Sequence, residues 1–312
     1  MHRIIITCLL GLVLWGCSKN AATGDRQLLL YSVDSEIAMG VEAAPQLTEE
    51  YGGAVKNAAL QAYVADIGSR MAATTEAYNP DLPWEFTLLD SDVINAFALP
   101  GGKVFVSRGL AVRMTNEAQL AAVLGHEIGH VTARHVGDRL SRAAIANGVA
   151  VAATVGAGMS DQNWAAAIPL VVGVGGQGYL LKFGRDQELQ SDALGVRYMA
   201  NVGYDPKGAY EVQKILEEAS AGGDRPPELL STHPYPERRQ EQIIALLEGE
   251  FAYTQNNSEY KLYPERYQSQ FLKRLAAMPA APDRALALEH PVTWCAVCQH
   301  HETPRSPESS SP

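Results

Sequence analysis

A five-residue pattern, His126-Glu127-Ile128-Gly129-His130, limits most narrowly what this 312-residue chain can fold into. Its two histidines are four residues apart, so on an α-helix they lie on one face, one turn above the other. That spacing allows two imidazoles to bind one Zn²⁺. Glu127 follows the first histidine on a neighbouring part of the helix surface, where it can take a proton from a water molecule activated by the metal. The pattern therefore predicts one zinc ion per chain, held on a helix.

The residues around this pattern predict the helix itself. Asn116 and Gln119 have the spacing of a capping box, which marks the N-terminus of a helix. Apolar residues then recur at helical spacing, so one face of the helix should be buried. These residues are Leu120, Val123, Leu124, Ile128 and Val131.

A catalytic zinc site requires a further protein ligand. The metzincin spacing would place a histidine at position 136, where Val136 stands, so that class is excluded. His135 is out of register, and we interpret it as a solvated histidine at the helix end. Glu188 is the better third ligand, because Asp192 follows it four residues later on the same predicted helix. Asp192 could then orient a ligand histidine through its free ring N–H.

The rest of the chain predicts a mixed class of fold. Alternating apolar residues indicate strands over residues 84–89, 93–99 and 103–107, with a Pro-Gly-Gly turn between the last two. Helical spacing indicates helices over residues 34–71 and 185–199, and from Pro206 to about Leu247. We expect an α+β protein: a mostly helical zincin of the gluzincin type, whose third ligand is a glutamate, with a small antiparallel sheet.

Composition narrows the class of protein further. Hydrophobic residues make up 46% of the chain, which is typical of a folded globular protein with a sizeable core. The formal net charge is −10, which argues against a nucleic-acid partner.

The N-terminus has the pattern of a targeting segment. An apolar run too short to span a bilayer ends at Gly16-Cys17, which resembles a bacterial lipobox. We predict a lipoprotein signal peptide over residues 1–16, lipidation of Cys17 and a linker over residues 17–27. Ser18 after the cysteine, rather than Asp, favours the outer membrane, with the protein facing the periplasm. The alternative is an ordinary secretory signal with an incidental cysteine.

Two further segments allow more than one interpretation. Residues 143–157 and 164–181 are rich in Ala, Gly and Val, and we favour a packed helical hairpin over an apolar flap above the active site. Gly173, Gly175 and Gly178 match a dinucleotide fingerprint, but no βαβ unit surrounds them, so we interpret them as residues for close packing.

The C-terminal end carries a second cysteine-based motif. Cys295 and Cys298 have the spacing of a redox centre, yet no fold follows them. In an oxidising periplasm we expect a disulfide between them, with a peripheral metal site or a redox role as alternatives. Residues 303–312 are rich in Ser, Pro and Glu, and we expect them to be disordered.

Several separated motifs together resemble the zinc metallopeptidase family that includes HtpX and the CAAX prenyl endopeptidases, peptidase family M48. The resemblance covers residues 24–247 and is strongest to periplasmic lipoprotein members of the BepA and LoiP type. Ser191 stands where the family often has alanine, which affects neither carboxylate. The motifs are Asn95-Ala-Phe-Ala-Leu-Pro-Gly-Gly102, Gly125-His-Glu-Ile-Gly-His130, Arg185-x-x-Glu188-x-x-x-Asp192-x-x-Gly195, and Thr232-His233-Pro234 with Arg239.

The resemblance implies roles for further residues. Asn95, Ala96 and Phe97 would form an edge strand that pairs with an extended polypeptide substrate. His233 would lie near the zinc, where it would either stabilise the oxyanion or cap the idle site. Arg239 would be its structural or electrostatic partner at the substrate.

The resemblance also implies an activity and a setting. A zinc metallopeptidase domain over residues 28–262, followed by a C-terminal extension over residues 263–312, would cleave unfolded or misassembled envelope proteins. The outer-membrane protein assembly machinery is an implied partner. The alternatives are a lipid-anchored chaperone or assembly factor that uses the zinc domain for binding, and a zinc amidase that acts on cell-wall peptides.

Overall fold

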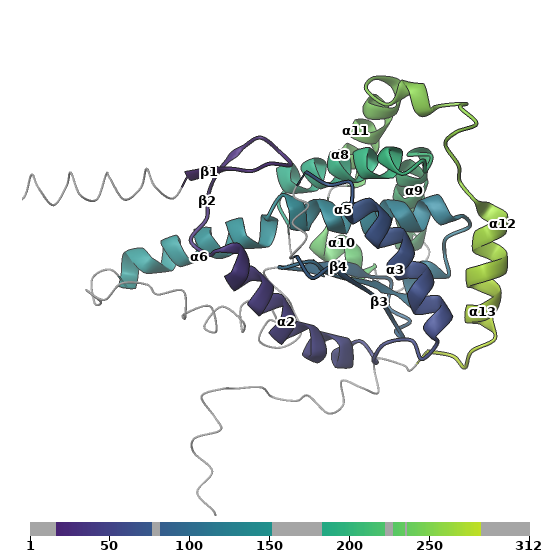
Figure 1. Cartoon of the computed structure of the whole chain (residues 1–312), viewed down its shortest axis with the longest axis horizontal. Helices are drawn as coiled ribbons and strands as arrows, with labels where there is room; N and C mark the ends of the chain where they lie inside the picture. Colours follow the sequence, from purple (N-terminus) through teal and green to yellow (C-terminus); the bar gives the residue numbers. More distant parts are fainter. Residues whose placement is uncertain (1–16, 77–81, 152–182, 222–226, 235, 282–312) are drawn as a thin grey trace, which may run out of the picture.

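The computed structural model describes residues 17–76, 82–151, 183–221, 227–234 and 236–281 (Figure 1). Within these residues, no helix is both long and apolar enough to cross a membrane. The predicted signal peptide, the Cys295–Cys298 pair, the glycine fingerprint and the C-terminal tail lie outside the described residues, as does the apolar segment beyond Val151.

The sheet has three strands, β3 (Glu85–Leu89), β4 (Ala96–Leu99) and β5 (Lys103–Ser107), in the order β3-β5-β4. β4 and β5 pair antiparallel across a turn in which Gly101 has a φ of 76° and Gly102 a φ of 89°. β3 pairs with β5 in parallel, so the sheet is mixed. The sequence had predicted a sheet that is antiparallel throughout, and that prediction is wrong. The reason is that β5 inserts between β3 and β4, and it runs in the same direction as β3.

Helix α5 (Glu117–Thr132) lies at the centre of the molecule, with α3 (Ala58–Ala72), α8 (Arg185–Asn201) and α9 (Lys207–Ala221) packed around it (Figure 1). Its N-cap is Asn116, whose Oδ1 accepts from the N–H of Gln119 at 3.0 Å. Gln119 in turn accepts from the N–H of Thr115, one residue earlier than a capping box requires. The predicted helix and its N-cap are therefore confirmed, but the return hydrogen bond to Gln119 comes from Thr115 instead of Asn116.

The crossing of α5 and α8 depends on small residues. A Cβ on Gly195 would lie 2.9 Å from the backbone N of His126, and one on Gly129 would lie 2.7 Å from Oγ of Ser191. Ser191 also donates to the backbone oxygen of His126 at 2.5 Å. This close approach brings the acidic face of α8 against the histidines of α5.

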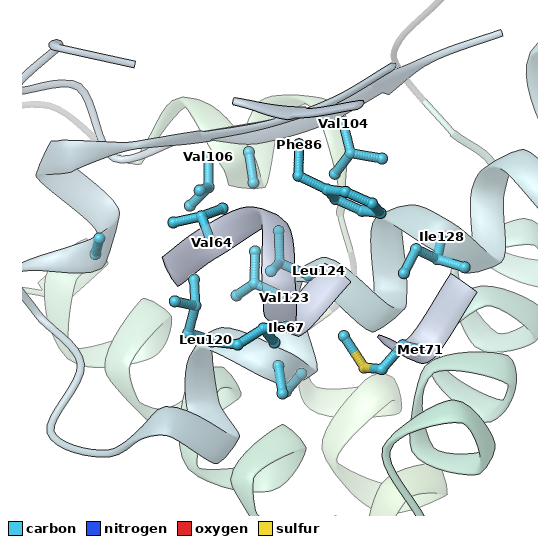
Figure 2. Close-up of a cluster of buried hydrophobic side chains, with 14 of the residues drawn as sticks. Val64, Ile67, Met71, Phe86, Val104, Val106, Leu120, Val123, Leu124 and Ile128 are labelled. Carbon is cyan, nitrogen blue, oxygen red and sulfur yellow. The ribbon is translucent and has the colours of Figure 1, made fainter. Parts of the chain in front are cut away.

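The main core lies between the sheet and the central helices (Figure 2). The predicted stripe of α5 is buried there, except for Val131, which packs at the edge of the core. Each fully buried aliphatic side chain of this size stabilises the fold by about 1.5–3 kcal/mol. The partners of the stripe are Val64, Ile67 and Met71 from α3 and Phe86, Val104 and Val106 from the sheet.

The segment predicted as a linker is folded onto the domain. Its strands β1 (Cys17–Lys19) and β2 (Arg26–Leu28) pair antiparallel. The Nδ2 of Asn20 donates to the backbone oxygen of Thr132 at 3.0 Å, and Gln27 donates to that of Ala133 at 2.7 Å. Both carbonyls belong to the C-terminal end of α5, where helix carbonyls lack partners in the helix.

The first part of the predicted C-terminal extension also packs on the domain. It forms α12 (Pro264–Arg266), η4 (Tyr267–Leu272) and α13 (Lys273–Ala276). Tyr267, Phe271 and Leu275 are buried in the main core, so the domain continues past residue 262. The remaining elements are α2 (Val33–Glu50), α4 (Arg108–Ala111), α6 (His135–Val151), α10 (Glu228–Thr232), α11 (Pro236–Glu248) and η3 (Ala252–Thr254).

Candidate metal centre

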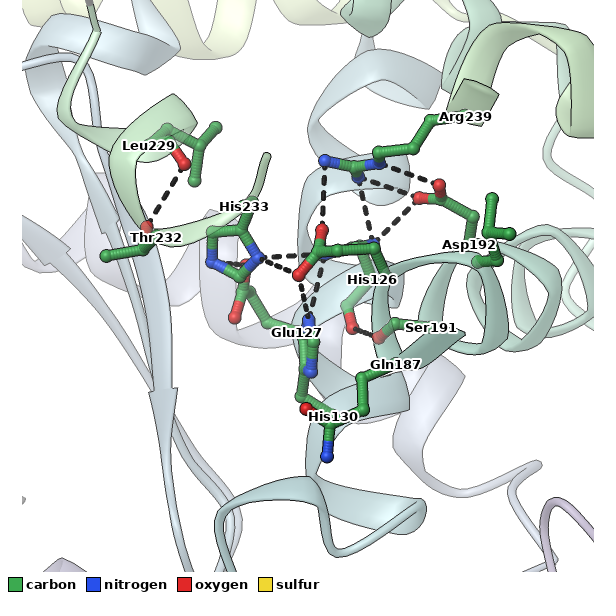
Figure 3. A network of polar contacts seen from close by, with 12 residues as sticks. His126, Glu127, His130, Gln187, Ser191, Asp192, Leu229, Thr232, His233 and Arg239 are labelled. Atoms are coloured by element: carbon green, nitrogen blue, oxygen red, sulfur yellow. Dashed lines mark hydrogen bonds and ion pairs between the residues drawn. The ribbon is translucent and has the colours of Figure 1, made fainter. Parts of the chain in front are cut away.

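Four side chains from three parts of the chain meet at one point (Figure 3). His126 and His130 come from α5, Glu188 from the first turn of α8, and His233 from the C-cap of α10. One ligand atom of each lies within 4.8 Å of those of the others, and all four residues are buried. The structure thus brings together the three predicted ligands and adds His233 as a fourth.

The spacing of these atoms fits a zinc ion. Nε2 of His126 lies 3.0 Å from Nε2 of His130 and 3.2 Å from Nδ1 of His233, which is 3.1 Å from Oε1 of Glu188. The Glu188 carboxylate lies 3.5 Å from His126 Nε2 and 3.6 Å from His130 Nε2. Four donors at zinc bond lengths, about 2.0–2.1 Å, would stand about 3.3 Å apart at tetrahedral angles. Imidazole nitrogens and a carboxylate are also the donors that zinc takes.

Asp192 sets the orientation of His126. Its Oδ1 lies 2.8 Å from Nδ1 of the histidine, so it accepts the Nδ1–H and leaves Nε2 free for a metal. Without a metal, burial and Arg239 lower the pKa of His126, but Asp192 and Glu188 outweigh them and raise it to about 9. Bound Zn²⁺ would therefore replace a proton on Nε2.

Arg239 bridges the carboxylates of Asp192 and Glu188, and Figure 3 shows its contact with Asp192. It donates to both oxygens of Asp192, at 2.7 and 2.8 Å, and its Nη1 lies 3.1 Å from Oε2 of Glu188. Burial raises the pKa of Glu188, but the charges of His233 and Arg239 outweigh it and hold that pKa well below the usual range. The structure therefore places Arg239 against Asp192 and Glu188, where it keeps both acids ionised; contact with a substrate remains a prediction.

His135 is 1% exposed, so the expectation of a solvated histidine is wrong. Its Nδ1 lies 2.8 Å from Nδ1 of His130, and its Nε2 lies 2.9 Å from Oε1 of Gln190, whose amide nitrogen donates to Asp25. A carboxylate can only accept, so the amide oxygen of Gln190 must face His135. His135 then carries its proton on Nε2, and its Nδ1 accepts from His130. Nε2 of His130 is left free for a metal.

The backbone conformation explains why the sequence did not predict the contact between His135 and His130. α5 ends at Thr132, and Arg134 has a φ of 54°, in the left-handed region. This turn starts a new helix, α6, at His135, so the register of α5 does not extend to it. Burial lowers the pKa of His135 to about 4, which keeps the imidazole neutral as an acceptor.

Glu127 lies beside the cluster and is 1% exposed. Its Oε1 is 3.7 Å from Nε2 of His233, and its Oε2 has no hydrogen-bond partner among the described residues. Burial raises the pKa of this carboxyl, although His233 and His126 oppose the shift. A buried carboxylate with a free oxygen next to a metal site can accept a proton from a bound reactant.

Phe183 covers the cluster, and no sequence motif pointed to it. Its ring stacks on His130 with the centroids 3.8 Å apart, and it is 3% exposed. Its N–H donates to the backbone oxygen of Thr232, the residue before His233.

Of the residues predicted to bind substrate, Ala96 and Phe97 begin the edge strand β4, and Asn95 directly precedes it. Ala96 and Phe97 are buried, and their strand is paired with β5 on one side. The Nδ2 of Asn95 donates to the hydroxyl of Tyr51 at 2.9 Å and to Glu228 at 3.2 Å. The side chain of Asn95 therefore holds the start of β4 against α10, and substrate pairing along β4 stays a prediction.

A family model described as Peptidase family M48 matches residues 58–246, a range that contains all four members of the cluster. The chain belongs to peptidase family M48. The buried cluster of this M48 domain is its zinc site. Among the described residues, the family model thus covers α3 to α11, while the N-terminal hairpin and the helices after Pro264 lie outside it.

Similar M48 relatives come from bacteria and mitochondria. The chain is 33% identical over 215 residues to "Beta-barrel assembly-enhancing protease" of Escherichia coli K12, a match that covers 67% of this chain and 43% of the relative. It is 29% identical over 214 residues to "Mitochondrial metalloendopeptidase OMA1" of Schizosaccharomyces pombe, covering 68% of this chain and 61% of the relative. The chain spans about two fifths of the length of the bacterial relative.

Proposed function

We propose that this M48 domain is a zinc-dependent endopeptidase that hydrolyses peptide bonds in extended polypeptides. The observation that carries the proposal is the free Oε2 of Glu127 beside a four-residue cluster of zinc-type donors. Zinc, when bound, polarises the substrate carbonyl and lowers the pKa of a water molecule. Glu127 takes the proton from that water and passes it to the leaving amine. Its raised pKa suits both transfers.

The supporting residues keep the ligands ready for the metal. Asp192 holds His126 with Nε2 free, and Arg239 keeps both Asp192 and Glu188 ionised. His233 has two candidate roles, and its contacts favour the capping role, because its Nδ1 meets Glu188 and His126 at the position of a fourth ligand.

The substrates that we infer are unfolded or misassembled envelope proteins. The name of the bacterial relatives, beta-barrel assembly-enhancing protease, supports this class. The lipobox-like residues at Cys17 support anchoring by lipid to the outer membrane, on the periplasmic side. The edge strand β4, which begins with Ala96 and Phe97 directly after Asn95, is the element that we expect to pair with an extended segment of such a protein.

A comparison of wild type with Glu127→Gln on denatured casein tests the activity. We expect cleavage to be lost in the variant while its zinc content, measured by atomic absorption, stays at one ion per chain. Equal cleavage by both proteins would contradict the mechanism. If Glu127→Gln fully restored growth to a deletion strain, a chaperone or assembly role would explain the protein better. Release of fragments from purified peptidoglycan would favour an amidase.

A further inference from the structure

A small cavity lies beside the metal cluster. Its volume is about 30 Å³, and Glu127 and His233 form one of its walls. Three more ionisable residues, His126, Asp192 and Arg239, line it as well. Its apolar part includes Ala122 of α5 and Val212 and Leu216 of α9. A group inside this cavity would therefore touch the residues that we assign to the reaction.

Gln213 is the polar residue that α9 contributes to the cavity lining. The residue lines the cavity and is 3% exposed. Its Oε1 is buried and has no hydrogen-bond partner among the described residues. A buried acceptor without a partner is costly, and buried polar groups are rarely left in this state unless something else satisfies them. A donor on a bound molecule would satisfy this oxygen.

The wall that carries Gln213 is held firmly in place. α9 packs directly on α5, and a Cβ on Gly208 would lie 2.7 Å from the backbone carbonyl of Ala118. The side chain of Leu216, 1% exposed, anchors the next turn of α9 in the main core. A polar group on such a rigid wall can discriminate between ligands, because it cannot move away from a mismatched one.

We propose that this cavity is a subsite for one substrate side chain next to the scissile bond, and that Gln213 selects short side chains that carry a hydrogen-bond donor. This inference rests on the proposed peptidase function. The volume admits roughly two or three heavy atoms, which excludes aromatic and long side chains. The side chains of threonine and serine are small enough for the cavity, and their hydroxyls can donate to Oε1 of Gln213.

Threonine and valine provide the sharpest comparison, since their side chains have the same shape and differ only in the hydroxyl. Zinc-loaded protein would digest denatured casein, with cleavage sites mapped by mass spectrometry, and then alanine-based peptides with a single Thr or Val. We expect wild type to cleave the Thr peptide about tenfold faster than the Val peptide at one position beside the bond. In Gln213→Leu the preference should be lost or reversed. Cleavage of the Thr and Val peptides at equal, measurable rates by wild type, or an unchanged Thr preference in Gln213→Leu, would overturn the subsite.

Gln240→Leu is the matched control, because this side chain on α11 donates to Glu217 in an exposed contact, its one side-chain hydrogen bond among the described residues. It should keep the Thr preference of wild type. Thermal unfolding of Gln213→Leu, together with the more isosteric Gln213→Met, separates a change of selectivity from a loss of fold. Both variants should unfold near the wild-type temperature and still cleave the Val peptide.

Binding separates the subsite from the activity. Fluorescence anisotropy with the Glu127→Gln variant should give about tenfold tighter binding of the Thr peptide than of the Val peptide, and adding Gln213→Leu should remove the difference. If wild type cleaved nothing but this binding preference held, the peptidase function would fail and the subsite would stand. If cleavage occurred without any effect of Gln213 on rates or binding, the function would stand and the subsite would fail.

Discussion

The Nδ1 atoms of His130 and His135 lie 2.8 Å apart, although His135 begins a different helix. Together with Gln190 and Asp25, this contact fixes which nitrogen of His130 carries the proton. The two histidine ligands of α5 are therefore oriented in different ways, His126 by a carboxylate and His130 by a neutral imidazole.

Replacement of His135 by phenylalanine should weaken zinc binding by about 10–100-fold, the usual effect of losing a group that orients a ligand. The ring of His130 would lose its acceptor and could rotate or change tautomer. Competition with a chromophoric chelator measures the affinity. Gln190→Leu should have a smaller effect in the same direction. Unchanged affinity in His135→Phe would show that the contact does not orient His130.

Replacement of Arg239 by leucine should destabilise the protein by about 3–5 kcal/mol, because Asp192 and Glu188 would lose the buried cation that bridges them and keep only their histidine contacts. Urea unfolding of the metal-free protein measures this change. Arg239→Lys keeps the charge but loses the two-pronged contact with Asp192, so it should recover only part of the stability. A loss below about 1 kcal/mol in Arg239→Leu would contradict the bridging role.

Zinc affinity should rise with pH across the neutral range. In the metal-free site the pKa of His126 is raised to about 9, so zinc must displace a proton at lower pH. Affinity should then fall up to tenfold for each pH unit below about 9. Asp192→Asn removes the main cause of the raised pKa, so its affinity should depend less steeply on pH. Equal slopes for the two proteins in chelator titrations would contradict this assignment.

The same raised pKa predicts how the stability of the metal-free protein varies with pH. Protonated His126 should stabilise the fold fully below its unfolded pKa of about 6.5, and this contribution should be lost as pH rises through about 9. Urea midpoints measured from pH 6 to pH 10 test the direction. The decline should be smaller in Asp192→Asn than in wild type.

Replacement of Phe271 by alanine should destabilise the protein by about 3–5 kcal/mol, because this side chain is fully buried in the main core although it lies outside the predicted domain. Tyr253→Ala is the matched control, since that ring is 55% exposed and should cost much less. Urea unfolding distinguishes the two. Equal effects would mean that residues 264–276 do not belong to the folding unit.

Local spacing was enough to predict the two histidine ligands on α5 and the helix that carries them, whereas Glu188 on α8 was assigned only in combination with the histidine motif. Four-residue spacing places side chains on one helix face regardless of what packs around it. The mixed sheet could not be predicted in this way, because the position of β5 between β3 and β4 depends on contacts distant in sequence.

Of two other differences, one had a signal in the sequence and one had none. The aromatic and aliphatic residues Tyr267, Phe271 and Leu275 have a four-residue spacing, which indicates a buried helical face, but the segment is short and lies after a stretch rich in Tyr, Asn and Glu. For His135, the deciding feature is the left-handed backbone of Arg134, and an arginine carries no signal for that conformation.

The N-terminal hairpin of β1 and β2 limits how far the zinc centre can lie from Cys17. Asn20 is hydrogen-bonded to the end of α5, and only three residues of chain lead back from it to Cys17, a span of at most about 10 Å. If Cys17 carries the proposed lipid, the folded domain cannot move far from its anchor. The zinc centre then works at a nearly fixed height above the bilayer. Only polypeptides that come close to the membrane surface would then be cut. The short connection between Cys17 and Asn20 would therefore limit which substrates reach the zinc centre.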